Sequence, residues 1–202
     1  MILARDYFLS DDVLTMARNL LGKYIFTKIE GQLSGGIITE TEAYRGTCKR
    51  ASHAFGGKKT ARNAVMYEKG GISYVDLCYG VHHLFHIVTN KEGIPDALLI
   101  RAFIPTHGEE LILKRTGGNT ISSAVANGPG KVSRALGITR EQNNIEIPSS
   151  QIWLEDRALL VSSAEISTLP PTGVDYAGED TLLPYRFLWS PDLSSLSSLS
   201  FS

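Results

Sequence analysis

The sequence predicts one α+β domain with a curved, largely antiparallel β-sheet, flanking helices and a protruding β-hairpin. Runs rich in β-branched and aromatic residues are joined by short glycine-bearing connections, which is typical of antiparallel strands. Helical and strand-like runs are mixed without the regular alternation of a parallel sheet. The length of 202 residues suits a single domain, expected over residues 1–190 and followed by a low-complexity, disordered tail over 191–202.

The first half is expected to contain one helix and two pairs of strands. Ser10, Asp11 and Asp12 precede apolar residues at helical spacing, Val13 to Leu21, and this run ends at Gly22. Strands are expected at 24–29 and 33–44, and again at 72–80 and 82–90 around Gly80. The basic, glycine-rich segment between the pairs should be a loop with a short helix near 61–68.

The second half alternates less regularly. A strand is expected at 97–103 and a helix at 105–115, because Pro105 suits a helix start. Gly128, Pro129 and Gly130 should form a tight loop before a short helix at 131–138. Further strands are expected at 152–155, 158–166 and 185–189.

The composition limits the class of protein. No run of about 18 apolar residues suggests a membrane span, and the first residues lack the apolar core of a secretory signal. The two cysteines, Cys48 and Cys78, do not suggest a disulfide framework. We therefore expect an intracellular protein, cytoplasmic or nucleoid-associated, that makes no membrane contact, and nothing in the sequence requires more than a monomer.

Positive charge is concentrated in one segment although the net charge is only −1. Residues 43–67 contain six basic residues and no acidic one. The six are Arg45, Lys49, Arg50, Lys58, Lys59 and Arg62. Such a run is either a solvated surface or a local patch that binds a phosphate backbone, since a backbone senses local rather than overall charge.

Three polar residues share one face of the expected strand at 33–44. Glu40, Glu42 and Tyr44 lie two residues apart, so their side chains point the same way. Two neighbouring carboxylates raise the pKa of at least one, and burial raises it further, which favours a general base near neutral pH. The alternative is that one or both glutamates simply pair with an arginine.

Two other patterns leave alternatives open. His82 and His86 stand four residues apart, with Asp76 upstream, as metal ligands on a helix could. However, no Glu follows the first histidine and the surroundings favour a strand, so we expect no metal site. The loop at 128–130 lacks a Walker pattern; it is either a simple turn or, with Gly130 and Lys131, a cradle for one backbone phosphate.

Five ordered blocks together resemble the alkyladenine (3-methyladenine) DNA glycosylase family of base-excision repair enzymes. They are ITETEAYRG, ASHAFGGKKTARNAVMY, ISYVDLCYG, LLIRAF and ANGPGKVSRALGI, and the later TGVDYAGEDTLLPYRF is similar too. The resemblance runs from the first helix to about residue 190. It implies a monofunctional enzyme that flips an alkylated purine out of double-stranded DNA, hydrolyses its N-glycosidic bond and leaves an abasic site.

The resemblance also implies residue roles. Glu42 would activate the water that attacks the sugar, and Arg101 would help to orient it. Tyr44, His53 and Tyr74 would line the base pocket, and Tyr79, at the expected hairpin tip, would fill the gap left in the duplex. The DNA backbone would be bound by a basic set, comprising Arg50, Lys58, Lys59, Arg62, Gly130 and Lys131. No metal or cofactor is implied, because alkylation already makes the base a good leaving group.

Two residues depart from the family pattern. Asp76 stands where the family has a second aromatic wall, and His86 stands where it has an asparagine. We expect Asp76 to favour cationic lesions such as 3-methyladenine and 7-methylguanine over neutral hypoxanthine or ethenoadenine. Alternatively, Asp76 and His86 hydrogen-bond to each other across the hairpin and close the pocket, which would weaken or alter the activity.

Two rival functions stay open from the sequence. The first is a catalytically weak or inactive homologue that binds damaged DNA, although a binder gains nothing from a carboxylate near phosphates. The second is a metal-dependent hydrolase that uses Asp76, His82 and His86, which metal analysis would test.

Overall fold

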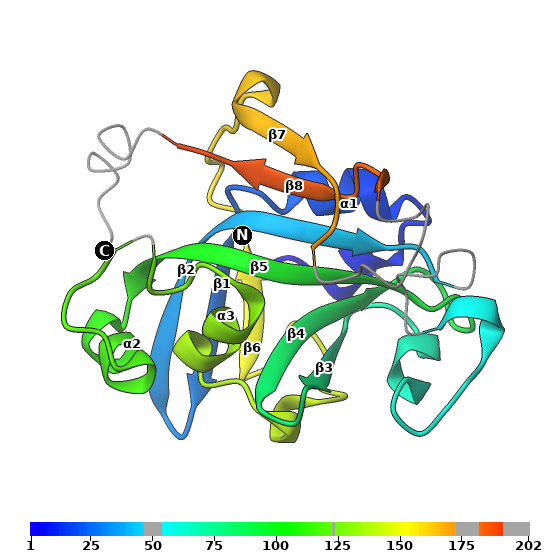
Figure 1. Cartoon of the computed structure of the whole chain (residues 1–202), viewed down its shortest axis with the longest axis horizontal. Helices are drawn as coiled ribbons and strands as arrows, with labels where there is room; N and C mark the ends of the chain where they lie inside the picture. Colours follow the sequence, from blue (N-terminus) through cyan, green and yellow to red (C-terminus); the bar gives the residue numbers. More distant parts are fainter. Residues whose placement is uncertain (47–53, 123, 173–181, 192–202) are drawn as a thin grey trace.

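The computed structural model describes residues 1–46, 54–122, 124–172 and 182–191 (Figure 1). Its α-helices are α1 (Val13–Asn19), α2 (Glu109–Thr116) and α3 (Pro129–Leu136). Short 3-10 helices are η1 (Arg5–Leu9), η2 (Phe55–Gly57), η3 (Ala64–Tyr67), η4 (Arg140–Gln142) and η5 (Ser163–Glu165). The strands are β1 (Tyr24–Ile29), β2 (Gln32–Tyr44), β3 (Ile72–Cys78), β4 (His82–Thr89), β5 (Asp96–His107), β6 (Ile152–Glu155), β7 (Ile166–Leu169) and β8 (Arg186–Trp189).

One curled antiparallel sheet organises the domain and confirms the predicted α+β class. The strand order is β3-β4-β5-β2-β1-β6, with β8 paired to β2 and β7 paired to β8. In Figure 1 the long strands β2 and β5 run through the middle, with α2 and α3 on one side of the molecule and α1 beside β8. The β3–β4 hairpin is present, whereas its protrusion from the surface stays a prediction.

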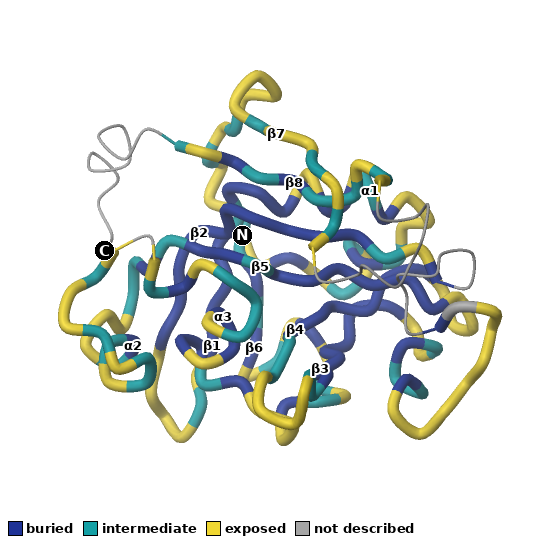
Figure 2. The backbone as a smooth tube through the Cα atoms, viewed as in Figure 1, coloured by how far each residue is buried: buried dark blue, intermediate teal, exposed yellow. Residues whose placement is uncertain are grey.

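Hydrophobic side chains pack on both faces of the β3–β4 hairpin. One cluster joins Val75 and Phe85 to α3 through Val132 and Leu136. A second, smaller cluster places Tyr74 with Met66 of η3 on the opposite face. Figure 2 shows the central strands buried and the connecting loops exposed. The hairpin is therefore held between α3 and the segment that contains η3.

A bulge in the central pair of strands shapes the site. Along β2 and β5, Thr41 pairs with Ile100 but Glu40 pairs with Ala102, so Arg101 has no partner across the pair. A bulge of this kind redirects the extra side chain and increases the local twist. It brings Arg101 to the face that holds Glu42.

The predicted helix at 105–115 begins later, at Glu109. Pro105 instead belongs to β5, opposite Gly36, next to a shift of register. Proline is tolerated there because an irregular ladder does not need its missing N–H group. The predicted start of the first helix agrees with the structure, because α1 begins at Val13 with Asp12 as its capping residue.

The strand predicted at 158–166 is wrong over most of its length. Only the end of this segment, from Ile166, enters β7. Leu160 is 91% exposed and Ala158 has a left-handed backbone, with a φ of 58°, so no alternating buried face forms. The helix predicted near 61–68 is a 3-10 helix over Ala64–Tyr67.

The tail predicted at 191–202 lies, from residue 192 onward, outside the described residues. Within the part of the chain that the structure describes, no helix is long and apolar enough to cross a bilayer.

Candidate active site

Strand β2 brings Glu40, Glu42 and Tyr44 to one face of the sheet, as the two-residue period predicts. Their contacts agree with this placement, because Tyr44 Oη donates to Glu42 Oε2 at 3.2 Å and both glutamates bind the same arginine. Glu42 has no exposed surface, and Glu40 is 5% exposed. Two buried carboxylates therefore stand side by side and require compensating cations.

Arg101 supplies the first of these cations. Its Nε donates to Glu40 Oε1 at 2.9 Å and its Nη1 donates to Glu42 Oε2 at 3.0 Å. One planar guanidinium thus fixes the spacing of both carboxylates, as its rigid fork of donors allows. The arginine partner that the sequence left as an alternative is present, and it binds Glu40 and Glu42 together.

Arg186 of β8 supplies the second cation. Its Nη1 donates to Glu40 Oε1 at 3.2 Å, and its Nε donates to the carbonyl oxygen of Pro170 at 3.0 Å. Glu40 therefore lies between two arginines, Arg101 and Arg186. Two guanidinium groups therefore offset the Glu40 charge, and one of them, Arg101, also binds Glu42.

The environment of Glu42 suits a base. Burial raises the pKa of its carboxyl group, and Arg101 and the Thr172 amide partly oppose this rise. The Thr172 N–H donates to Glu42 Oε1 at 2.7 Å. Among the described residues, the donors to Glu42 are Arg101, Tyr44 and Thr172. A carboxylate accepts at about four positions, so one position is left for a further donor such as water.

A row of side chains crosses the sheet from Glu42. Glu42 pairs with Leu99, Leu99 pairs with His86, and His86 pairs with Tyr74. Residues directly opposite each other in antiparallel strands share a face. The His86 ring lies 5.9 Å from the Tyr44 ring and 5.2 Å from the Tyr74 ring, between centroids. Three predicted pocket residues thus form one aromatic group beside Glu42.

Asp76 lies at the far end of this group and is held by Arg62. Arg62 Nε donates to Asp76 Oδ1 at 2.7 Å, and Nη2 donates to Oδ2 at 2.8 Å. The carboxylate is almost fully buried, with 2% of its side chain exposed, whereas the Arg62 side chain is 59% exposed. Tyr74 Oη also donates to Asp76 Oδ1, at 3.4 Å, and burial and the Asp76 charge raise the pKa of Tyr74.

This pairing bears on the alternative in which Asp76 bonds His86. The two residues are diagonal neighbours, because His86 lies opposite Tyr74 while Asp76 lies opposite Leu84. Nδ1 of His86 lies 3.1 Å from the Leu84 carbonyl oxygen. Asp76 has a two-pronged partner in Arg62, and a bond between Asp76 and His86 stays a prediction.

Tyr79 occupies the turn of the β3–β4 hairpin. It is 90% exposed, and both Tyr79 and Gly80 have left-handed backbones, with φ of 51° and 72°. Gly80 adopts this conformation without strain, but an aromatic residue does so rarely. An exposed aromatic ring in a strained turn is the kind of outlier that suggests a function outside the fold itself.

The predicted DNA-backbone residues are spread over two segments. Lys58 and Lys59 are exposed before η3, and Lys59 lies 5.5 Å from the Tyr67 ring centroid. Gly130 and Lys131 lie in the first turn of α3, and Lys131 Nζ donates to the Ala124 carbonyl at 3.0 Å. Arg50 and His53 lie outside the described residues.

The metal alternative finds no support in this geometry. Within the described ranges, no three His, Cys, Asp or Glu side chains gather closely enough to hold a metal ion. Asp76, His82 and His86 therefore do not form such a group.

Residue-by-residue reasoning missed two groups, the Thr172 amide and Arg186. Both lie in TGVDYAGEDTLLPYRF, the late segment that resembles the family, but their contacts with Glu42 and Glu40 span 130 and 146 residues. The sequence also did not predict the pairing of Arg62 with Asp76, because the two residues lie 14 positions apart in different elements.

Residues 7–192 match the family model described as methylpurine-DNA glycosylase. A protein of Chlamydia abortus named "Putative 3-methyladenine DNA glycosylase" is 45% identical over 188 residues, which cover 93% of this chain and 97% of that protein. Proteins with the same name are 41% identical in Desulfitobacterium hafniense, covering 92% and 93%, and 37% identical in Bacillus cereus, covering 90% and 93%.

Proposed function

Because this chain belongs to the methylpurine-DNA glycosylase family, we propose that it is a monofunctional DNA glycosylase of base-excision repair. Its substrate is double-stranded DNA with an alkylated purine, and its products are the free base and an abasic site. The observation that best supports the chemistry is Glu42, a buried carboxylate with a raised pKa and one acceptor position left for water.

The reaction is a hydrolysis. The electron pair of the N-glycosidic bond leaves with the base, water oxygen bonds to the sugar C1′, and Glu42 takes the proton of that water. The Glu42 charge also offsets the positive charge that develops on the sugar. Arg101 holds Glu42 at 3.0 Å and so orients the carboxylate for this step.

The base is proposed to bind against the aromatic group. The His86 ring lies against the rings of Tyr44 and Tyr74, and Tyr44 contacts Glu42, so a nucleotide flipped out of the duplex would meet the aromatic group and the carboxylate together. A cationic alkylated purine gains about 0.5 to 2 kcal/mol from an aromatic face. His53 is assigned to the same pocket by family resemblance.

Asp76 is proposed to bias the pocket toward cationic lesions. Its charge is already matched by Arg62, so a cationic base gains only by sharing or replacing that partner. A neutral base cannot share or replace Arg62 as the partner of the Asp76 carboxylate. Because the base loses its charge as the bond breaks, this attraction strengthens binding rather than the chemical step.

Binding to the duplex is proposed to use Tyr79 and the exposed cations. Tyr79, 90% exposed, would enter the minor groove and fill the space of the flipped nucleotide. Lys58 and Lys59 on one side and Gly130 and Lys131 on the other would contact phosphates. Arg62 has a second donor group, Nη1, outside its two bonds to Asp76 and can contribute to the same surface.

The second candidate is a homologue that binds damaged DNA with little or no catalysis. The complete burial of Glu42 favours it, because a base must reach water. Release of free base separates the two candidates.

The test is excision from duplex oligonucleotides that contain 3-methyladenine, 7-methylguanine, hypoxanthine or ethenoadenine. Glu42→Gln should retain lesion binding and lose about 10² to 10⁴ in rate, which is typical for removal of a general base. Glu92→Gln, at an exposed site, is the matched control. A fully active Glu42→Gln would exclude the catalytic assignment, and lesion binding without base release by the wild type would favour the second candidate.

A further inference from the structure

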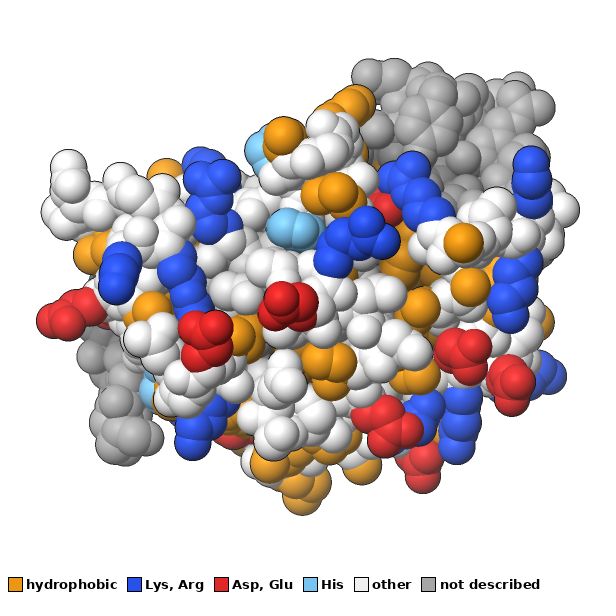
Figure 3. Space-filling model, turned by 90° about the horizontal axis from the view of Figure 1, so that it is seen from below, with side chains coloured by type: hydrophobic (Ala, Val, Ile, Leu, Met, Phe, Trp, Pro, Cys, Tyr) orange, Lys and Arg blue, Asp and Glu red, His pale blue; other side chains and the backbone are white. Residues whose placement is uncertain are grey.

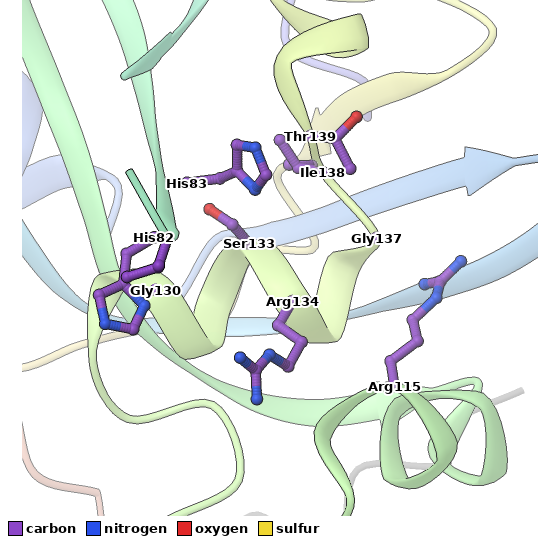
Figure 4. A pocket seen from close by; sticks show the side chains of 10 residues that line it. His82, His83, Arg115, Gly130, Ser133, Arg134, Gly137, Ile138 and Thr139 are labelled. Carbon is purple, nitrogen blue, oxygen red and sulfur yellow. The ribbon is translucent and has the colours of Figure 1, made fainter. Parts of the chain in front are cut away.

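A cavity of about 320 Å³ lies between the start of β4 and helix α3. Its lining comes from three places: the hairpin (Val81, His82, His83), α3 and the turn after it (Gly130, Ser133, Arg134, Gly137, Ile138, Thr139), and α2 (Arg115). Figure 4 shows His82 beside Gly130 and His83 facing Ser133, with Arg134 and Arg115 along the helices. Its volume lies at the low end of small-molecule sites, which occupy roughly 300 to 1,000 Å³.

The lining of this cavity is cationic. It contains two arginines and two histidines, and among the described residues no carboxylate lines it. Viewed from below, a histidine side chain lies near the middle of the molecular surface, with Lys or Arg side chains on either side and an acidic side chain below it (Figure 3). A concave site with this lining attracts an anion.

The two arginines play different parts. Arg115 Nη1 donates to Ser34 Oγ at 2.9 Å and to the Ala135 carbonyl at 3.2 Å, so Arg115 is fixed. A Cβ at Gly137 would lie 2.6 Å from the Arg115 guanidinium carbon, so Arg115 packs directly against the turn after α3. Arg134 is exposed, and no described residue accepts a hydrogen bond from its side chain. Its guanidinium remains able to bind both oxygens of a phosphate.

The cavity extends to the face of the β3–β4 hairpin opposite the candidate active site, and His82, next to the turn, borders it from the active-site face. Tyr74, Asp76 and His86 share the face of Glu42. His83 pairs with Leu77, the residue after Asp76 in β3. Because side chains alternate along a strand, His83 lies on the other face, where α3 packs. Tyr79 stands at the turn between the two faces.

This arrangement orients a bound duplex. The minor groove is about 6 Å wide and is bordered by both backbones, so a hairpin that inserts its tip has one backbone along each face. The strand with the flipped nucleotide must follow the face of Glu42. The other strand then passes the face with the cavity.

We propose that this cavity binds a backbone phosphodiester of the strand opposite the lesion, with Arg134 as its principal ligand. The proposal rests on the proposed function for the position of the lesion strand. It makes the protein selective for duplex over single-stranded DNA, because only a duplex presents a phosphate to both faces of the hairpin.

Binding of labelled, undamaged DNA by wild type and Arg134→Gln tests the proposal without requiring catalysis. Arg134→Gln should weaken duplex binding about tenfold at low salt, since a hydrogen bond to a charged group is lost. It should also lower the slope of log affinity against log salt by about one. Binding to the single strand should not change. Lys114→Gln, an exposed charge on the helix of Arg115, is the matched control.

Neutral methylphosphonate linkages then locate the phosphate. Placed one at a time opposite the lesion, one linkage should weaken wild-type binding but not that of Arg134→Gln. The same scan of the lesion strand should weaken both proteins equally. The proposal is overturned if no linkage on the opposite strand weakens wild-type binding more than it weakens binding by Arg134→Gln. It is also overturned if a linkage on the lesion strand has that unequal effect, or if Arg134→Gln weakens binding to duplex and single-stranded DNA equally. Failure to release any base would count against the proposed function alone.

Discussion

Replacing Arg62 with glutamine is expected to increase the preference for cationic over neutral lesions, and Asp76→Asn to decrease it. In the free protein the buried Asp76 carboxylate is paired with Arg62 through two hydrogen bonds of 2.7 and 2.8 Å. Without Arg62 the carboxylate lacks this partner, and a cationic purine can replace it. Without the Asp76 charge, a cationic purine has no advantage at this wall.

The magnitude follows from the unequal burial of the pair. Breaking a fully buried ion pair costs about 3 to 5 kcal/mol, and an exposed pair is worth less than about 1 kcal/mol. Asp76 is 2% exposed and Arg62 is 59% exposed, so we expect a value between them. A cost of about 1.4 kcal/mol corresponds to a tenfold change in the lesion ratio.

The assay is single-turnover excision of 7-methylguanine and hypoxanthine from matched duplexes at several enzyme concentrations. The change should appear in the enzyme concentration that gives half-maximal rate rather than in the maximal rate, because the attraction acts on the bound cation before bond cleavage. Lys58→Gln, which removes an exposed charge from the same segment, is the control. The reasoning is refuted if Arg62→Gln and Asp76→Asn move the ratio in the same direction, or if Lys58→Gln acts like Arg62→Gln.

Three further predictions concern the catalytic cluster and the hairpin. Only ionised Glu42 can accept a proton, and burial raises its pKa, so the excision rate should fall as the pH drops through a value above the usual 4.5. If the residual rate of Glu42→Gln fell with pH in the same way, this assignment would be contradicted. Tyr79→Ala should leave the melting temperature unchanged, because the ring is 90% exposed. It should reduce excision from duplex DNA by roughly 10- to 100-fold, because flipping costs a few kcal/mol. An equal loss of excision from single-stranded DNA would argue against a wedge. Arg186→Gln should loosen Glu40 and through it Arg101, so the maximal excision rate should fall by about two- to tenfold while lesion affinity stays constant. Arg186→Lys should restore part of the rate. A change in lesion affinity alone would exclude this positioning role.

The local features of the site could be read from the sequence because they depend on near neighbours. The two-residue period of a strand places Glu40, Glu42 and Tyr44 together, and their shared contacts bear this out. Similarly, the Tyr-Gly pair between two strand-like runs predicts a turn, and Tyr79 and Gly80 both have the left-handed backbone of such a turn. In both cases the backbone geometry of a few residues is sufficient.

The errors in the fold also have a local cause. Pro105 favours a helix start in isolation, but a shifted register between β2 and β5 makes room for it in a strand. Residues 158–166 have strand-like composition, yet most of them find no partner strand within the described part of the chain. A strand needs a neighbour, and the segment itself does not contain that information.

The charge balance of the site depended on the tertiary structure. The sequence alone determined that two carboxylates would share a face, and the family resemblance pointed to Glu42, but neither showed what would neutralise Glu40 or Asp76. Those partners are Arg101 and Arg186 for Glu40, and Arg62 for Asp76. The physical reason is that burying a carboxylate demands a partner without specifying where along the chain it comes from. Only the closing of distant segments onto one sheet selects that partner.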